Sequence, residues 1–246
     1  MNAGSGLMQG MRHALRGFRL ITKPGVRIFV AIPLLINIVV FALALSAAGM
    51  AVDYGLDRYL ADWPEWTRWI LWLILGLLAA ITVFFAFSLL ANLFAGPFNS
   101  MLAEAVERHL NPQMETLAFS WSRLLNEAAR SIRAELRKLI YIVLRALPLV
   151  VISLIPGVNV FAPMLWFLFG AWMLSMEYLD CPLGNHGRLF PTVIEEMRAQ
   201  RRLALGFGGS ITFLTIIPIV NFLAIPVGVA GATSMYCAHF SGESST

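Results

Sequence analysis

Residues 28–52 read IFVAIPLLINIVVFALALSAAGMAV, a run of 25 residues without a charged side chain. A helix needs about 20 apolar residues to cross the roughly 30 Å hydrocarbon core of a bilayer, so this run predicts a transmembrane helix. A second apolar run covers residues 69–91, and tryptophans gather where it begins, as is typical of a membrane interface: Trp63, Trp66, Trp69 and Trp72. We therefore predict two full spans, separated by a loop at residues 53–68.

The composition of the whole chain agrees with a membrane protein. Hydrophobic residues make up 59% of its 246 residues, charged residues only 13%, and the mean hydropathy is +0.74. Soluble domains are about 25% charged, so this chain has too few charges to cover a soluble surface. We predict an all-α integral membrane protein that forms a single membrane domain over residues 1–246.

The distribution of charge predicts the orientation. Residues 1–27 form a basic arm without a single acid, whereas the 53–68 loop is mainly acidic. By the positive-inside rule the N-terminus is cytoplasmic and the 53–68 loop is periplasmic. Residues 92–138 are expected to form cytoplasmic helices, with a break or kink at Gly96-Pro97. The basic arm lacks interleaved aromatic residues, so no nucleic-acid partner is expected.

Residues 114–138 have an apolar face and a charged face at helical spacing. One interpretation is an amphipathic helix packed on the membrane surface or on another helix. The other interpretation is an approach path for anions that is lined by arginines, among them Arg130. The sequence leaves both open.

Two later apolar stretches, 139–176 and 203–237, are each interrupted by prolines and an asparagine. Each splits into halves of about 14–17 residues, too short for a full crossing, so we predict two hemi-penetrating helical hairpins. The breaks read IPGVNVFAP at 155–163 and IPIVNFLAIP at 217–226. A repeated break of this kind indicates a transport site, although two independent turns would look similar. A cytoplasmic connector at 177–202 with a short helix at its end, and a tail at 238–246, complete the chain.

Catalytic chemistry is not indicated. The four histidines and two cysteines are isolated, and a metal site needs three or four converging ligands. Nucleotide-binding and hydrolase motifs are absent from the sequence. We expect no enzyme activity, no catalytic residue, no bound metal and no cofactor.

An anion-binding feature precedes the first span. Lys23 and Pro24 lead into Gly25, Val26 and Arg27, where free amides at a helix start, a glycine and a forked donor would meet. The alternative is a basic side chain that reaches lipid phosphate. Asparagines in or beside the apolar stretches could line a pore or bond between helices: Asn37, Asn92, Asn99, Asn159 and Asn221. Gly228 and Gly231 permit close helix approach, which could support oligomerisation.

Four stretches resemble the CysZ family of bacterial sulfate permeases, in the same order along the chain. They are PGVRIFVAIPLLIN at 24–37, NLFAGPFNSMLAE at 92–104, LIPGVNVFAPMLWFLFGAWMLSMEYLD at 154–180 and IPIVNFLAIPVGVAGATSM at 217–235. The resemblance implies a multi-pass protein of the bacterial inner membrane that admits sulfate for cysteine biosynthesis. It also implies two spans, two hemi-penetrating hairpins and a homo-oligomer in membrane lipid.

The family's sulfate-binding motif is G-x-R, often followed by a second arginine. Gly25, Val26 and Arg27 match this motif, but Ile28 stands where the second arginine would be. The resemblance also implies pore roles for Glu104 and for asparagines of the set above. We predict a passive or weakly coupled sulfate conduit. A proton-coupled symporter, with Glu104 as proton carrier, and a scaffold bound to a separate transporter remain as alternatives.

Overall fold

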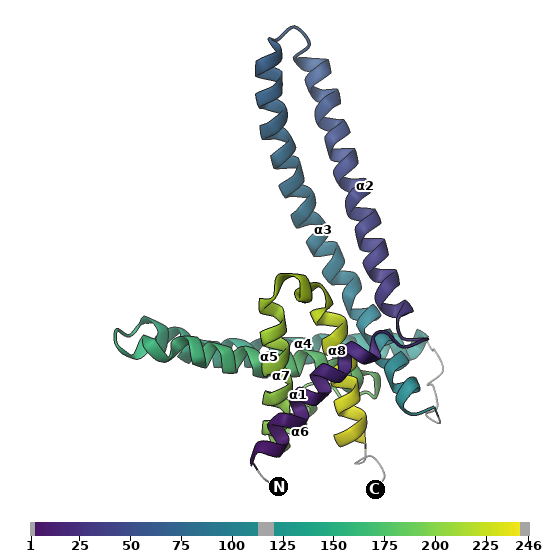
Figure 1. The fold of residues 1–246 in the computed structure, drawn as a ribbon, viewed down its shortest axis with the longest axis vertical. Coiled ribbons are helices and arrows are strands. Elements are labelled where there is room, and N and C mark those ends of the chain that lie inside the picture. Colours follow the sequence, from purple (N-terminus) through teal and green to yellow (C-terminus); the bar gives the residue numbers. More distant parts are fainter. Residues whose placement is uncertain (1–2, 113–120, 242–246) are drawn as a thin grey trace. The chain divides into compact units, whose positions relative to one another are not determined.

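The structure is a computed structural model that describes residues 3–112 and 121–241; the side chains of residues 3–4, 87–97, 121–132, 218–219 and 222 lie outside that description. Every regular element in the described part is a helix, which confirms the predicted all-α class (Figure 1). The elements are α1 (Ala3–Leu20), α2 (Ile28–Tyr59), α3 (Glu65–Leu110), α4 (Trp121–Leu154), the 3₁₀ helix η1 (Val158–Phe161), α5 (Ala162–Asn185), α6 (Thr192–Ala199), α7 (Arg201–Ile216) and α8 (Pro218–His239).

The chain divides into two compact units. Unit 1 contains residues 1–27 and 99–246, and unit 2 contains residues 28–98. The second boundary lies between Phe98 and Asn99, one residue after Gly96-Pro97, where the sequence predicts a break. The helix nevertheless does not end there, because α3 is helical from Glu65 to Leu110. The expected cytoplasmic helix after residue 92 is therefore the continuation of α3.

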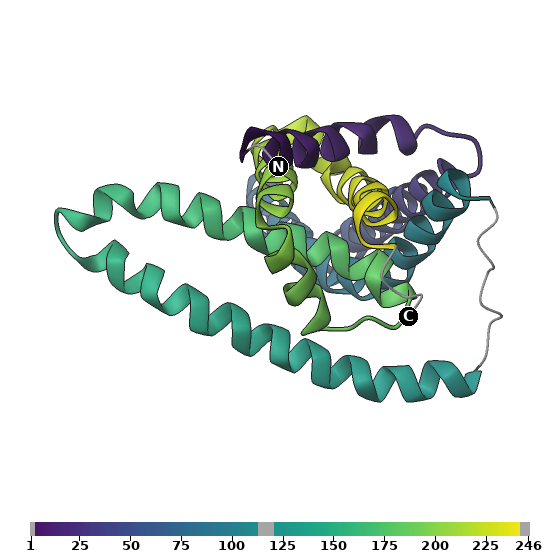
Figure 2. The same ribbon diagram turned by 90° about the horizontal axis from the view of Figure 1, so that it is seen from below.

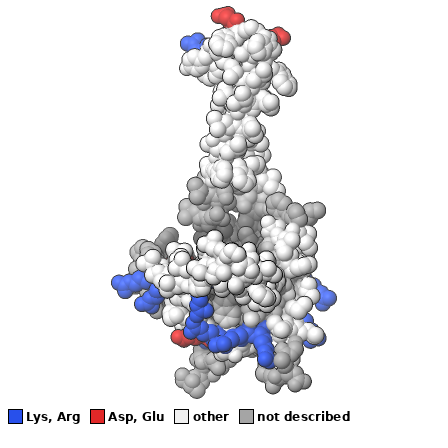
Figure 3. All heavy atoms as spheres, turned by 90° about the vertical axis from the view of Figure 1, so that its left-hand side faces the viewer, with Lys and Arg blue, Asp and Glu red and all other residues white. Residues whose placement is uncertain are grey.

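Unit 2 is an apolar hairpin of two long helices. Both helices extend beyond their apolar runs, so that only residues 60–64 connect them, in place of the predicted loop at 53–68. Near this turn the Trp72 Nε1 donates to Asp53 Oδ1 at 2.7 Å, and Arg68 pairs with Asp57. Figure 3 shows acidic atoms at this tip and an uncharged surface along the helices. Such exposed apolar surface is stable only when lipid or other protein covers it.

In the part of the chain that the structure describes, three helical segments are long and apolar enough to cross a membrane, compared with the two predicted spans. They are Ile28–Tyr59, Glu65–Ala86 and Val158–Asn185. The third was predicted as one short arm of a hairpin that ends at residue 176. It is longer because α5 continues through Glu177 and Asp180 to Asn185, since a helix does not have to end where its apolar run ends.

Unit 1 is built around α1, α5, α7 and α8. In Figures 1 and 2, α1 crosses α7 and α8, and its small residues make this crossing close. A Cβ atom at Gly10 or Gly17 would collide with backbone of α7 or α8, respectively. Gly228 and Gly231 of α8 also pack inside the chain, against Tyr178 and His13. These two glycines therefore cannot form the contact between copies of the chain that the sequence suggested.

The two predicted breaks in the apolar stretches are present as breaks between helices. Between α4 and α5 the chain turns through Gly157, with φ +85°, and then η1; between α7 and α8 a single extended residue, Ile217, suffices. The two breaks also share a bond, because the Asn159 amide donates to Ile155 O at 3.0 Å and the Asn221 amide to Ile217 O at 2.8 Å. The predicted boundary at residue 138, by contrast, lies inside the continuous helix α4.

Candidate functional site

The turn at residues 21–27 carries the predicted G-x-R site. Gly25 has φ +84°, a conformation that other residues adopt only with strain. Val26 is fully buried, together with Leu20 and Ile21 just before the turn. Val26 therefore anchors the turn in the core of unit 1, and the glycine lets the chain reverse so that Arg27 is exposed.

Two backbone amides of this turn already donate hydrogen bonds within the turn. The amides of Val26 and Arg27 both donate to Lys23 O, at 3.1 and 3.0 Å. Neither is free to bind an anion in this conformation, which differs from the predicted role of these amides. The Arg27 side chain is the remaining strong donor, and no carboxylate among the described residues pairs with it. An exposed, unpaired guanidinium can bind an oxyanion through two parallel hydrogen bonds.

The residues predicted to line a pore differ in their burial. Asn37 is exposed on α2, Asn159 on η1 and Asn221 on α8, while Asn99 is half-buried on α3. Figures 1 and 2 show that the α4–α5 turn, at the tip of its hairpin, lies apart from the α7–α8 turn within unit 1. One copy of the chain therefore does not bring the two hairpin asparagines together. The side chains of Asn92 and Arg130 lie outside the described residues.

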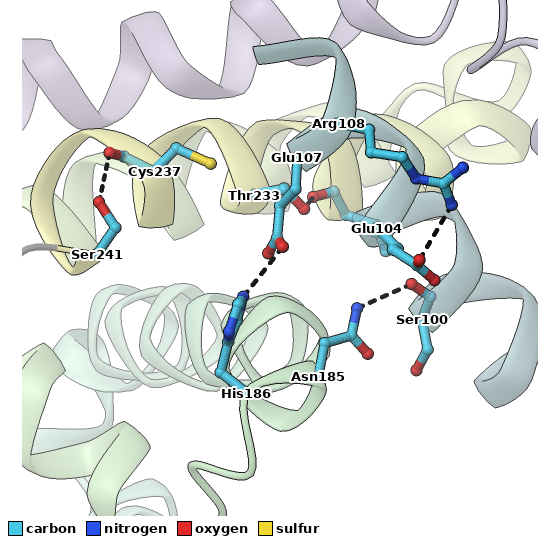
Figure 4. Close-up of polar contacts among 10 residues, drawn as sticks. Ser100, Glu104, Glu107, Arg108, Asn185, His186, Thr233, Cys237 and Ser241 are labelled. Atoms are coloured by element: carbon cyan, nitrogen blue, oxygen red, sulfur yellow. Dashed lines mark hydrogen bonds and ion pairs between the residues drawn. The ribbon is translucent and has the colours of Figure 1, made fainter. Parts of the chain in front are cut away.

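Glu104 is half-buried and bound to its own helix. Its Oε1 lies 3.0 Å from Arg108 Nη2, one turn further along α3 (Figure 4). The carboxylate is already balanced by a cation four residues away, an arrangement common on helix surfaces. This makes Glu104 a weaker candidate for a proton carrier than the sequence suggests.

A second polar cluster joins three helices around Glu107. His186 Nε2 lies 3.0 Å from Glu107 Oε2, and the imidazole stacks on Tyr236 with ring centroids 5.1 Å apart. Beside this pair, Asn185 Nδ2 donates to Ser100 O at 3.0 Å, and Figure 4 shows both contacts reaching from the end of α5 to α3. We call Glu107, His186 and Tyr236 the Glu107 cluster.

Burial sets the electrostatics of the Glu107 cluster. Glu107 is only 5% exposed, and its Oε1 has no hydrogen-bond partner among the described residues. Burial raises the pKa of Glu107, and the hydrogen bond from His186 offsets part of this effect. The carboxyl group consequently takes up a proton at a higher pH than an exposed glutamate does. A raised pKa in a buried cluster makes Glu107 a candidate functional residue.

Sequence reasoning missed the Glu107 cluster for a clear reason. Glu107 and His186 are far apart in the chain, and each stands in a stretch of mixed charge that resembles helix surface. The one available signal was periodicity: Glu107 follows Leu102, Ala103 and Val106, which are buried on the same helix. In the described part of the chain no three potential metal ligands lie together.

The fold and these sites define an all-helical membrane protein with an exposed cation at the start of a candidate span. The chain belongs to the family described as sulfate transporter CysZ/etoposide-induced protein 2.4, whose model matches residues 13–226. This membership confirms the family resemblance found in the sequence. The description of this family names a transporter.

Curated relatives cover nearly the whole chain. A protein named sulfate transporter CysZ from Pseudomonas aeruginosa (strain LESB58) is 38% identical over 229 residues, 92% of this chain and 93% of its own length. Its namesake from Pseudomonas fluorescens (strain Pf0-1) is 37% identical over 240 residues, 96% of each chain. The Vibrio cholerae protein of the same name (serotype O1, strain O395) is 37% identical over 233 residues, 93% of each chain.

Proposed function

We propose that this protein is a sulfate permease of the bacterial inner membrane that supplies sulfate for cysteine biosynthesis. The observation that carries the proposal is the match to sulfate transporters over at least 92% of the chain. The exposed Arg27, without a carboxylate partner among the described residues, supplies a site of suitable charge. Sulfate is a dianion, and a guanidinium binds two of its oxygens at once.

The arrangement in the membrane follows from charge and helix length. We place the N-terminus in the cytoplasm and the α2–α3 tip in the periplasm, because the basic arm precedes α2 and acids gather at the tip. The α4–α5 and α7–α8 hairpins would enter the membrane without crossing it. Since the hairpin asparagines lie apart in one copy, a pore that they line requires a homo-oligomer.

Substitution of Arg27 by alanine tests the sulfate site. Loss of a charge-assisted contact removes about 1.5–3 kcal/mol, so the apparent KM for sulfate should rise about tenfold or more. Arg27→Lys should fall between the two, because an ammonium keeps the charge and loses the forked geometry. The measurement is radiolabelled sulfate uptake into liposomes that contain only this protein.

Arg19→Ala provides the matched control for this measurement. Arg19 is also an exposed arginine of the basic arm, but it lies on α1 before the turn. Its removal changes the net charge equally and should leave the KM for sulfate within about twofold. Equal loss in both variants, or unchanged uptake by Arg27→Ala, would remove Arg27 from the sulfate site.

A second function, proton-coupled sulfate symport, is favoured by the raised pKa of Glu107. It predicts faster uptake under an inward proton gradient, and loss of this acceleration in Glu107→Gln, which cannot carry a proton. Glu104→Gln is the control, because the Glu104 carboxylate is half-buried and paired with Arg108. If sulfate uptake by the unsubstituted protein is the same with and without a proton gradient, symport is excluded and the protein is a passive conduit.

The scaffold alternative is separated by the same preparation. A scaffold for another transporter moves no sulfate by itself, whereas a permease needs no other protein. Uptake by liposomes that contain only this chain therefore decides between them. Absence of uptake with and without the gradient would contradict the proposed function.

A further inference from the structure

Helix α1 presents three distinct faces. Its small residues, Gly6, Gly10, Ala14 and Gly17, lie on one face at helical spacing and pack against α7 and α8. Ala14 is fully buried there, and a side chain at Gly10 would meet the backbone at Leu203 and Phe207. This face fixes the rotation of α1 about its own axis, and with it the direction of the other two faces.

The second face is apolar, and no other helix among the described residues covers it. Leu7, Met8, Met11 and Leu15 are 43%, 55%, 49% and 59% exposed. On a helix with 3.6 residues per turn, these four side chains form a single stripe about 100° wide. Large apolar side chains on one continuous stripe, rather than scattered singly, mark a surface that another apolar medium covers.

The third face is basic. Arg12, Arg16 and Arg19 are exposed and lie next to the apolar stripe, on the side away from α7 and α8. No acidic residue occurs before Asp53 in the chain, so α1 contains no carboxylate of its own to balance them. Arg12 makes one described side-chain contact, from Nη2 to the sulfur of Met8 at 3.7 Å. On the face of unit 1 that Figure 3 shows, Lys and Arg atoms also outnumber acidic ones.

An anionic lipid surface matches both the apolar stripe and the basic face of α1. An apolar stripe bordered by arginines is the pattern of helices that lie in the headgroup layer of a membrane. The chain reaches the candidate span α2 after residues 21–27 only, so α1 is tethered close to the bilayer. The aliphatic part of an arginine side chain contacts the apolar layer, while its guanidinium group binds lipid phosphate.

We propose that α1 is an anionic-lipid-binding helix, with Leu7, Met8, Met11 and Leu15 inserted among acyl chains and Arg12, Arg16 and Arg19 bound to lipid phosphates. The lipid surface thereby holds α1 from outside while α7 and α8 hold it from inside. This inference goes beyond the proposed function, because it does not depend on which ion the protein transports.

Spin labels on adjacent residues test the insertion of α1. In the full chain with Cys181→Ser and Cys237→Ser, one label is placed at Leu15→Cys and another at Arg16→Cys, on neighbouring residues of different faces. In nanodiscs that contain phosphatidylglycerol, oxygen should relax the label at position 15 more strongly than a water-soluble nickel complex does. The reverse should hold at position 16. Similar accessibility at both positions would overturn the proposal.

A second copy of the chain is the competing cover for the apolar stripe. It would shield position 15 from oxygen as well as from nickel, and two labels at position 15 would lie within about 20 Å of each other across the contact. Either result would overturn the proposal. A label exposed to acyl chains, without such a short distance, supports it.

Lipid selectivity tests the arginines in the protein with its natural cysteines. Spin-labelled phosphatidylglycerol and phosphatidylcholine compete for the protein surface, and their immobilised fractions give a relative affinity. Each arginine near an anionic surface contributes about 1 kcal/mol, so Arg16→Gln should lower the preference for phosphatidylglycerol about fivefold. Combined Gln substitutions at Arg12, Arg16 and Arg19 should abolish it.

The matched control removes the same charge from elsewhere in unit 1. Gln substitutions at Arg133, Arg137 and Arg198, which are exposed on α4 and α6, should leave the preference within about twofold. An equal loss in this control would show that net charge, rather than α1, selects the lipid, and would overturn the proposal.

Discussion

The Gly208→Ala variant is expected to be strongly destabilised, although it adds a single methyl group. A Cβ atom at residue 208 would overlap the Ala171 carbonyl oxygen and would lie 2.8 Å from Ser175 Oγ. The main obstacle is backbone of α5, which cannot rotate away as a side chain can. We expect a loss of roughly 3 kcal/mol or more, which lowers the Tm by roughly 6–12 °C.

Gly209→Ala is the control, on the same helix and with the same change in composition. The nearest atoms to a Cβ at residue 209 are ring carbons of Phe167 at 3.9 Å, an ordinary van der Waals distance. Alanine is also the better helix former, by up to about 1 kcal/mol, so this variant should be neutral or slightly more stable. Thermal unfolding in detergent, followed by size-exclusion chromatography, measures both. Equal Tm values for the two variants would contradict the described crossing of α5 and α7.

These adjacent glycines illustrate what the sequence could predict. The sequence places Gly206, Gly208 and Gly209 close together, but it does not tell which of them faces α5. The long apolar runs, by contrast, predicted α2 and the first part of α3 correctly as candidate spans. Length and hydropathy are properties of a segment, whereas a helix crossing depends on residues far apart in the chain.

The candidate site was predictable to the same limited extent. Gly25 and Arg27 follow from a local motif, and the turn is present with Gly25 at positive φ. The hydrogen bonds from the Val26 and Arg27 amides to Lys23 O were not predicted. The sequence pattern treats these amides as the free N–H groups at the start of a helix and does not show the turn that precedes α2. The Glu107 cluster was missed since it joins the end of α3 to the end of α5.

Lys138→Met is expected to weaken the packing of α4 on α5 at the end of their hairpin that lies away from the turn. Lys138 is 5% exposed, and its Nζ lies 2.7 Å from Glu177 Oε2, 3.0 Å from Asp180 Oδ2 and 3.8 Å from Glu135 Oε1. Methionine preserves the length of the side chain, but it leaves three carboxylates facing one another without a cation. Breaking a buried ion pair costs about 3–5 kcal/mol.

Lys138→Met should lower the free energy of unfolding by less than the loss of a fully buried ion pair does, because solvent screens part of the interaction. Glu177 and Glu135 have side chains about 60% exposed, so only the contact to Asp180 is largely buried. We expect roughly 2–3 kcal/mol and a Tm lower by roughly 4–12 °C. Arg137→Met removes the neighbouring exposed cation on α4 and should leave the Tm within about 2 °C.

The pH dependence of Lys138 distinguishes an ion pair from simple packing. Burial alone would lower the pKa of Lys138, but the carboxylates of Asp180 and Glu177 outweigh burial and raise it above the ordinary value of 10.5. A raised pKa of a lysine stabilises the folded state at all pH values below the ordinary one, and this contribution is lost as the pH rises through the raised value. The deficit of Lys138→Met should therefore be complete at pH 7 and pH 9. It should shrink only in strong alkali, or in acid where the carboxylates are protonated. A deficit of the same size at pH 3 and pH 7 would mean that Lys138 acts through packing, and the three carboxylates would then have no part in holding α4 against α5.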